Sequence, residues 1–170
     1  MAIDLDDEIV QDFLVEAGEI LEKLNEQLVE LEQTPDDYDL LNAIFRGFHT
    51  IKGGAGFLNI TALVDICHKA EDVFNALRQG ARRVDPNLMD VILQVLDVVN
   101  SMFKTVGLGR DPEPAEADLL ERLKILALPQ QEPLENEVLS SLPQNLPVVE
   151  EPSTLGAVPQ PAGRNVVEEV

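Results

Sequence analysis

Apolar residues recur every three or four positions in five successive segments of the first 128 residues, and this spacing restricts the chain to helices that pack on one another. The predicted helices cover residues 7–33, a stretch from 37 through the glycines that follow, and residues 61–79, 86–107 and 115–127. Turn residues separate them, because Thr34-Pro35 breaks the first helix and Gly80 ends the third. The sequence therefore predicts an all-α fold, an up-and-down four-helix bundle with a fifth helix at its C-terminal end.

The apolar stripes predict which face of each helix is buried. The stripe of the first helix consists of Ile9, Phe13, Ala17, Ile20, Leu24, Leu28 and Leu31. That of the third consists of Leu63, Ile66, Cys67, Ala70, Val73, Phe74 and Leu77. We expect Asn59 or Thr61 to cap the third helix, and Asp85, followed by Pro86, to cap the fourth.

The composition changes after Leu128, where prolines and glutamates replace the regular apolar spacing and no aromatic residue occurs. Such a segment buries too little apolar surface to offset the entropy lost on ordering. We expect residues 1–128 to form one domain and residues 129–170 to be a flexible Pro/Glu-rich linker. A linker at this position indicates that the chain is the front part of a longer protein.

The charge and the apolar runs exclude several classes of function. Twelve basic against 32 acidic residues give a formal net charge of −20, which argues against nucleic acid or an anionic membrane as partner. No apolar run approaches the ~18 residues of a membrane span, and the acidic N-terminus is unlike a signal peptide. Cys67, the single cysteine, lies in an apolar stripe and is expected to be an inert core thiol. We therefore predict a cytoplasmic protein without membrane insertion.

The stretch Phe48–Asn59, FHTIKGGAGFLN, is the most unusual in the chain. Glycine inside a helix costs roughly 1 kcal/mol relative to alanine, and three glycines fall within four positions here. Close approach is a plausible reason for them, because removing side chains lets a large partner reach His49. Gly53 matters most, since it lies one turn beyond His49 on the same flank.

The residues around His49 favour phosphoryl transfer. If the second and third helices are antiparallel neighbours, His49 can face His68 and Glu71. A carboxylate that accepts a hydrogen bond from one imidazole nitrogen leaves the other with a free lone pair, which is a nucleophile near neutral pH. Lys52, one turn along, could offer positive charge to a phosphoryl group. We hypothesise that His49 accepts a phosphoryl group from one protein and gives it to another.

Two runs of residues match a known family. FRGFHTIKGGAGFL, from Phe45 to Leu58, and CHKAEDV, from Cys67 to Val73, closely resemble the histidine phosphotransfer domain at the N-terminus of CheA-type chemotaxis kinases. The resemblance covers about residues 5–128. It implies that His49 is the phosphoacceptor and that Glu71 holds its Nδ1, so that Nε2 is phosphorylated. It also implies that Lys52 and His68 are supporting polar neighbours and that Gly53 gives access.

The same resemblance implies the partners. The separate ATP-binding domain of the kinase, which holds Mg-ATP, would phosphorylate His49, and an aspartate of a CheY-like or CheB-like response regulator would receive the group. The family's kinase, dimerisation, receptor-coupling and regulator-docking domains do not match any part of these 170 residues. We therefore expect this fragment to bind no ATP, cofactor or metal and to be monomeric, while its parent would be a protein-histidine kinase.

Other interpretations remain open at this point. The chain could be a free-standing phosphotransfer protein, or a module of a hybrid kinase in another relay. It could also be a helical metal-binding protein or scaffold that uses His49, His68 and Glu71 as ligands, although the paired Glu-x-x-His elements of di-iron bundles are missing. A nucleotide-binding loop is rejected, because the glycines lack the Gly-x-x-x-x-Gly-Lys-Ser/Thr order and no strand precedes them.

Overall fold

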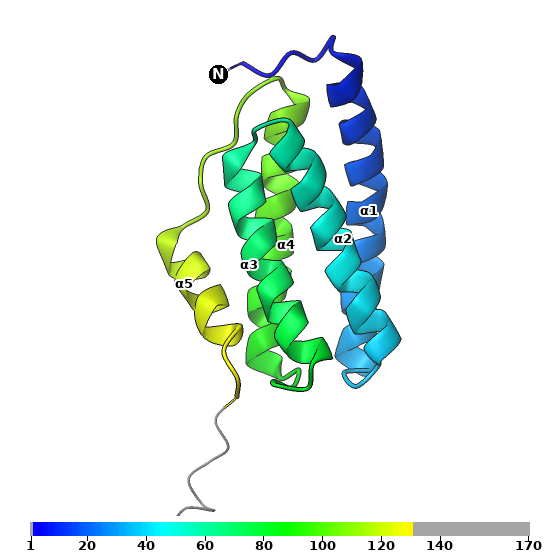
Figure 1. Ribbon diagram of the computed structural model, residues 1–170, viewed down its shortest axis with the longest axis vertical. Helices are drawn as coiled ribbons and strands as arrows, with labels where there is room; N and C mark the ends of the chain where they lie inside the picture. Colours follow the sequence, from blue (N-terminus) through cyan, green and yellow to red (C-terminus); the bar gives the residue numbers. More distant parts are fainter. Residues whose placement is uncertain (1, 131–170) are drawn as a thin grey trace, which may run out of the picture. The chain divides into compact units, whose positions relative to one another are not determined.

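The computed structural model describes residues 2–130, and the predicted linker over residues 131–170 lies outside the described part. The described residues form five helices and no strand, as the sequence predicted (Figure 1). The helices are α1 (Glu8–Gln33), α2 (Tyr38–Phe57), α3 (Thr61–Arg78), α4 (Pro86–Gly107) and α5 (Ala117–Leu126).

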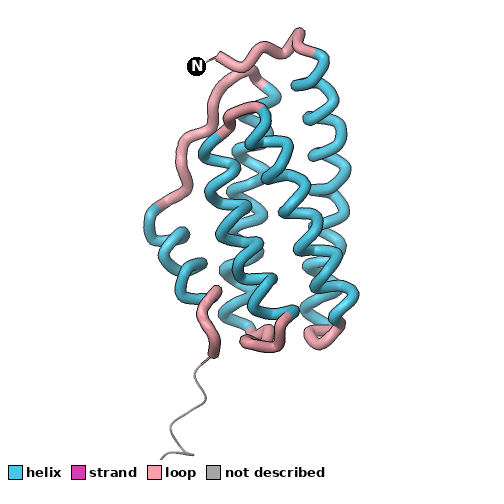
Figure 2. Tube along the Cα trace, in the orientation of Figure 1, coloured by secondary structure: helices cyan, strands magenta, loops and turns pink. Residues whose placement is uncertain are grey.

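The first four helices form a closed ring of neighbours. α1 packs on α2, α2 on α3, α3 on α4, and α4 returns to α1, while α5 packs on α3 and α4. Short loops join α1 to α2, α2 to α3 and α3 to α4, so these helices run in alternating directions, whereas a longer segment, residues 108–116, leads from α4 to α5 (Figure 2). The all-α, up-and-down bundle with a fifth helix is confirmed, and with it the antiparallel pairing of α2 with α3.

The buried face of α1 differs from the predicted stripe at two positions. Val10 and Leu21 are buried, whereas Ile9 is 49% exposed and Ile20 is only partly buried. Both the predicted and the observed set of buried residues recur at steps of three and four. In the observed set Val10, Ala17, Leu24 and Leu31 are seven residues apart, as are Leu21 and Leu28, and this spacing keeps an apolar seam facing a nearly parallel neighbour. The buried residues of α1 are Val10, Phe13, Ala17, Leu21, Leu24, Leu28 and Leu31.

Three aspartates begin the helices as N-caps. The side chains of Asp7, Asp37 and Asp85 accept hydrogen bonds from backbone amides in the first turns of α1, α2 and α4. A cap of this kind contributes about 1 kcal/mol of helix stability. The Asp85 cap, with Pro86 as the first helical residue, is as predicted.

The predicted cap of α3 is wrong. Ile60 occupies the N-cap position, and no side chain makes a capping hydrogen bond there. Asn59 instead adopts a left-handed backbone conformation, with φ of 59°, which turns the chain between α2 and α3. Asparagine tolerates that conformation better than most residues do, so Asn59 serves the turn and not the helix.

The chain remains attached to the bundle two residues beyond the predicted domain end. The backbone amide of Gln130 donates to the carbonyl oxygen of Ala81 at 2.8 Å, and the Gln130 side-chain oxygen accepts from the amide of Arg83 at 3.2 Å. α5 begins at Ala117, because the preceding Glu116 has an extended backbone with ψ of 137°. Among the described helices, none is long and apolar enough to cross a membrane.

Candidate functional site

His49 lies on α2, at the surface beside the core. The preceding Phe48 and the following Ile51 are buried, so the helix is fixed in rotation, while the His49 side chain is 61% exposed. α2 packs on α3, which carries Glu71, and the two helices therefore bring residues 22 positions apart into contact. The position at the rim of the bundle agrees with the helical geometry expected from the sequence.

Glu71 contacts His49 directly. Its Oε1 lies 2.7 Å from His49 Nδ1, and Glu71 is the only buried polar or charged residue in the described part of the chain. An ionised carboxylate can only accept, so Nδ1 carries the proton and donates it. The lone pair of the imidazole is then on Nε2, on an exposed ring that makes no hydrogen bond from this atom to another described residue.

Lys52 balances the charge of Glu71. Its Nζ lies 2.6 Å from Glu71 Oε2, which is buried and has no aligned hydrogen bond within residues 2–130. A buried carboxylate oxygen without a compensating charge is costly, and the ammonium supplies that charge. The sequence suggested that Lys52 would point its charge toward an incoming group, whereas the structure pairs it with the carboxylate behind the histidine.

The pKa of Glu71 reflects these contacts. Burial by itself raises the pKa of this carboxyl, but the short contact with the charged Lys52 ammonium and the hydrogen bond from His49 outweigh burial and hold the pKa below its ordinary value. Glu71 is therefore ionised at neutral pH and remains an acceptor for the Nδ1 proton.

The glycines of α2 have separate purposes. A Cβ built on Gly53 would meet no atom within 4 Å, so this position is open surface one turn from His49. A Cβ on Gly54 would lie 2.6 Å from Cδ2 of Phe13, so Gly54 lets α1 and α2 approach. The prediction that all the glycines clear space for a partner is therefore wrong for Gly54, because adjacent helical residues face different neighbours.

His68 and Cys67 lie next to one another on α3 but in different environments. His68 is exposed, and its Nε2 lies 3.9 Å from Oδ1 of Asp72 one turn along. Its contact in the described structure is therefore with Asp72, whereas Glu71 contacts His49 and Lys52. Cys67 is fully buried, and burial raises the pKa of its thiol to about 12, as expected of an inert core cysteine.

Comparison with known proteins decides the family. The model of the Hpt domain family matches residues 8–102 of the chain. The chain belongs to the Hpt domain family.

Relatives of this Hpt domain include CheA and CheAY proteins of several bacteria. It is 48% identical over 99 residues to the sensor histidine kinase CheAY of Helicobacter pylori, covering 58% of this chain and 12% of that protein. It is 37% identical over 97 residues to the chemotaxis protein CheA of Borreliella burgdorferi, covering 57% of this chain and 11% of that protein. The chain thus spans only a small part of the curated relatives it matches.

A solved structure supports the same assignment. The solution structure of the histidine phosphotransfer domain of CheA has a TM-score of 0.65 and 32% sequence identity, and the match covers 75% of this chain and 98% of that one. The Hpt domain described here is therefore a phosphotransfer module of two-component signalling, of the CheA type. The similarity to CheA-type domains expected from the motif is confirmed.

The sequence did not lead us to predict that Phe45 and Arg78 lie beside His49 in this Hpt domain. The ring of Phe45 stacks near the imidazole, with centroids 6.1 Å apart and planes 12° from parallel. The guanidinium carbon of Arg78, on α3, lies 3.8 Å from the centre of the Phe45 ring. The spacing of Glu71, Asn75 and Arg78 along one face of α3 is a signal that could have indicated Arg78.

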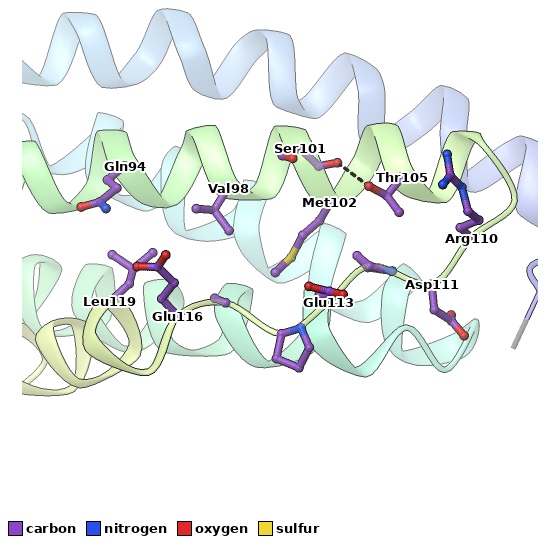
Figure 3. Close-up of a pocket in the computed structure, with 13 residues that line it drawn as sticks. Gln94, Val98, Ser101, Met102, Thr105, Arg110, Asp111, Glu113, Glu116 and Leu119 are labelled. Carbon is purple, nitrogen blue, oxygen red and sulfur yellow. Dashed lines mark hydrogen bonds between the residues drawn. The ribbon is translucent and has the colours of Figure 1, made fainter.

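A cavity of about 630 Å³ lies elsewhere in the Hpt domain, between α4, α5 and the segment that joins them (Figure 3). Met102 and Leu119 line it on the two helices, and Arg110 and Glu113 come from the connecting segment. None of the predicted site residues lines it. The described residues also contain no cluster of three or more His, Cys, Asp or Glu side chains that could hold a metal ion.

Proposed function

We propose that His49 accepts a phosphoryl group at Nε2 from the ATP-binding domain of a CheA-type kinase and transfers it to an aspartate of a response regulator. The observation that carries this proposal is the 2.7 Å contact between His49 Nδ1 and the buried Glu71 carboxylate. It leaves an exposed Nε2 with a lone pair, which is what a nucleophile requires.

In the first step, Nε2 attacks the γ-phosphorus of ATP held by the kinase. The N–P bond forms, the bond from the γ-phosphorus to the bridging oxygen breaks, and ADP leaves with that electron pair. The imidazole already carries a proton on Nδ1, so the ring becomes positively charged as Nε2 bonds to phosphorus. The Glu71 carboxylate, 2.7 Å away, stabilises that charge without taking part in the bond changes.

In the second step, a carboxylate oxygen of the regulator attacks the same phosphorus. The O–P bond forms, the N–P bond breaks, and the electron pair returns to Nε2, which restores the neutral imidazole with its proton on Nδ1. Lys52 keeps Glu71 ionised throughout, because its ammonium lies 2.6 Å from Oε2. Gly53 leaves the surface beside the histidine open to both partners.

The partners supply the remaining chemistry. We propose that Mg-ATP binds to the kinase domain, that the regulator's Mg²⁺ lies in its own acidic pocket, and that the regulator is CheY-like or CheB-like. The Hpt domain contributes position and a nucleophile, which is what phosphoryl transfer mainly requires of an acceptor. The relatives named CheA favour chemotaxis over another relay.

Labelling tests this function. We expect the chain, incubated with ATP and a CheA-type kinase core that lacks its own acceptor domain, to gain an acid-labile, base-stable phosphate. His49→Gln should abolish labelling while the helical content by circular dichroism persists. His68→Gln is the matched control and should still be labelled, because His68 is an exposed histidine without contact to Glu71. Label that survives in His49→Gln would contradict the assignment.

A further inference from the structure

We infer that Phe45 and Arg78 are positioning residues for His49, an inference that rests on the proposed function. Three contacts join them in a chain across α2 and α3. Phe45 stacks near the imidazole at a centroid separation of 6.1 Å, and the Arg78 guanidinium lies 3.8 Å from the centre of the Phe45 ring. Glu71 holds one edge of the imidazole, and Phe45 restricts its face.

The need for such a contact follows from the exposure of the ring. The His49 side chain is 61% exposed, and among residues 2–130 it is held by one hydrogen bond, at Nδ1. A terminal ring torsion is broad, so a single hydrogen bond leaves the imidazole free to tilt. A nearly parallel neighbour at 12° limits that tilt and keeps Nε2 directed outward.

Arg78 is itself held in place on both sides. Its Nε donates to Oδ1 of Asn75 at 3.1 Å, within α3, and its Nη1 donates to Oδ1 of Asn42 at 3.3 Å, across to α2. A guanidinium fork fixed at two points is a rigid platform, and a cation over an aromatic face is attractive. Arg78 therefore holds Phe45, and Phe45 holds the imidazole.

The charge of Arg78 adds a second effect. The contacts of Arg78 in the described part of the chain are with the side-chain amides of Asn75 and Asn42 and with the Phe45 ring, so no carboxylate among them pairs with the guanidinium. The guanidinium carbon lies 3.8 Å from the centre of the Phe45 ring, which lies 6.1 Å from the centre of the imidazole. The guanidinium and the imidazole are therefore no farther apart than about one Debye length, ~10 Å at 0.1 M salt. In a protein with a net charge of −20, this cation reduces the repulsion that an incoming phosphoryl group meets.

The first readout is the protonation pattern of the imidazole. Long-range proton–nitrogen NMR correlation shows which ring nitrogen of His49 carries the proton in the intact chain. We expect a single tautomer protonated at Nδ1 in the native sequence, and a mixture in Phe45→Leu and Arg78→Met. Phe45→Tyr and Arg78→Lys should restore part of the native pattern, because the first keeps the ring and the second keeps the cation.

The second readout is the rate of phosphoryl acceptance. At saturating kinase core we expect Phe45→Leu and Arg78→Met to lower the rate constant about tenfold, with KM within about twofold, since misplacement of a nucleophile affects the chemical step. Phe103→Leu and Arg122→Met are matched controls. Phe103 is a partly buried phenylalanine paired with Phe13, and Arg122 donates to the Gln94 side chain.

The outcomes separate this inference from the proposed function. Native tautomer and native rate in folded Phe45→Leu and Arg78→Met would overturn the positioning role, as would a changed tautomer with an unchanged rate. Labelling of His49→Gln would overturn the phosphoacceptor assignment instead. The tautomer measurement would then still report whether the stack orients the imidazole.

Discussion

At the scale of single residues, the protonation state of Glu71 is the property on which the site depends. Its pKa lies below the ordinary value of 4.5, because the contacts with Lys52 and His49 outweigh its burial. A lowered folded-state pKa contributes stability above the unfolded-state pKa, and this contribution disappears as the pH falls through the folded-state value. The charged form is therefore the stable form at neutral pH.

This linkage gives a pH prediction. We expect the difference in free energy of unfolding between the native protein and Glu71→Gln to shrink as the pH is lowered from about 6 to below the ordinary Glu pKa of 4.5, because residue 71 of the unfolded native chain then takes up a proton that the folded state does not, and the variant lacks this group. Urea unfolding followed by circular dichroism at each pH measures it. A difference that stays constant over this range would show that the Glu71 charge does not contribute to stability.

Cys67 provides a second prediction for a single residue. The thiol is fully buried and its pKa is about 12, so almost no thiolate is present or accessible at neutral pH. We expect Ellman's reagent to react with it only as fast as the protein unfolds, and at the rate of a free thiol in about 6 M guanidinium chloride. Rapid reaction in native buffer would mean that the α3 core opens locally.

At the scale of elements, Gly53 and Gly54 give a matched pair of substitutions on α2. We expect Gly53→Ala to stabilise the protein by roughly 1 kcal/mol, because alanine is the better helix former and its Cβ meets open space. Gly54→Ala should destabilise it by about 1–3 kcal/mol, because its Cβ would lie 2.6 Å from Phe13. Thermal unfolding of both variants measures the difference.

A larger side chain at Gly53 tests access to His49. Gly53→Val should slow labelling by the kinase with little loss of folding, since its branched side chain stands beside His49 on an otherwise open surface. Normal rates of both acceptance and transfer in Gly53→Val would contradict the role of Gly53 in admitting a partner.

Much of this arrangement could be predicted from the sequence, because helical spacing is a one-dimensional property. It predicted the five helices, and it placed His68 and Glu71 opposite His49 once α2 and α3 were taken as neighbours. The structure brings Glu71 into contact with His49, whereas His68 lies near Asp72. It could not assign Gly54 to Phe13, since that contact depends on how far α1 slides along α2. Nor could helical spacing show that Arg78 contacts Phe45, because this contact between α3 and α2 depends on the register in which the two helices pack.

At the scale of the whole molecule, the described core lies between residues 10 and 126 and the last described contact is that of Gln130 with the α3–α4 loop. The linker interpretation of the C-terminal residues stays a prediction. It implies that truncation after Gln130 leaves the midpoint of thermal unfolding unchanged. A midpoint several degrees lower, measured by calorimetry against the full chain, would show that the removed residues stabilise the bundle.

The exposed position of the His49 ring has a kinetic consequence for the proposed relay. A single exposed nitrogen is the only atom that can hold the phosphoryl group in the proposed reaction, so the kinase domain and the regulator must compete for access to it. We therefore expect ping-pong kinetics, in which the kinase domain dissociates before the response regulator binds. The lifetime of the phosphorylated intermediate, between those two visits, would set how long the module retains its signal.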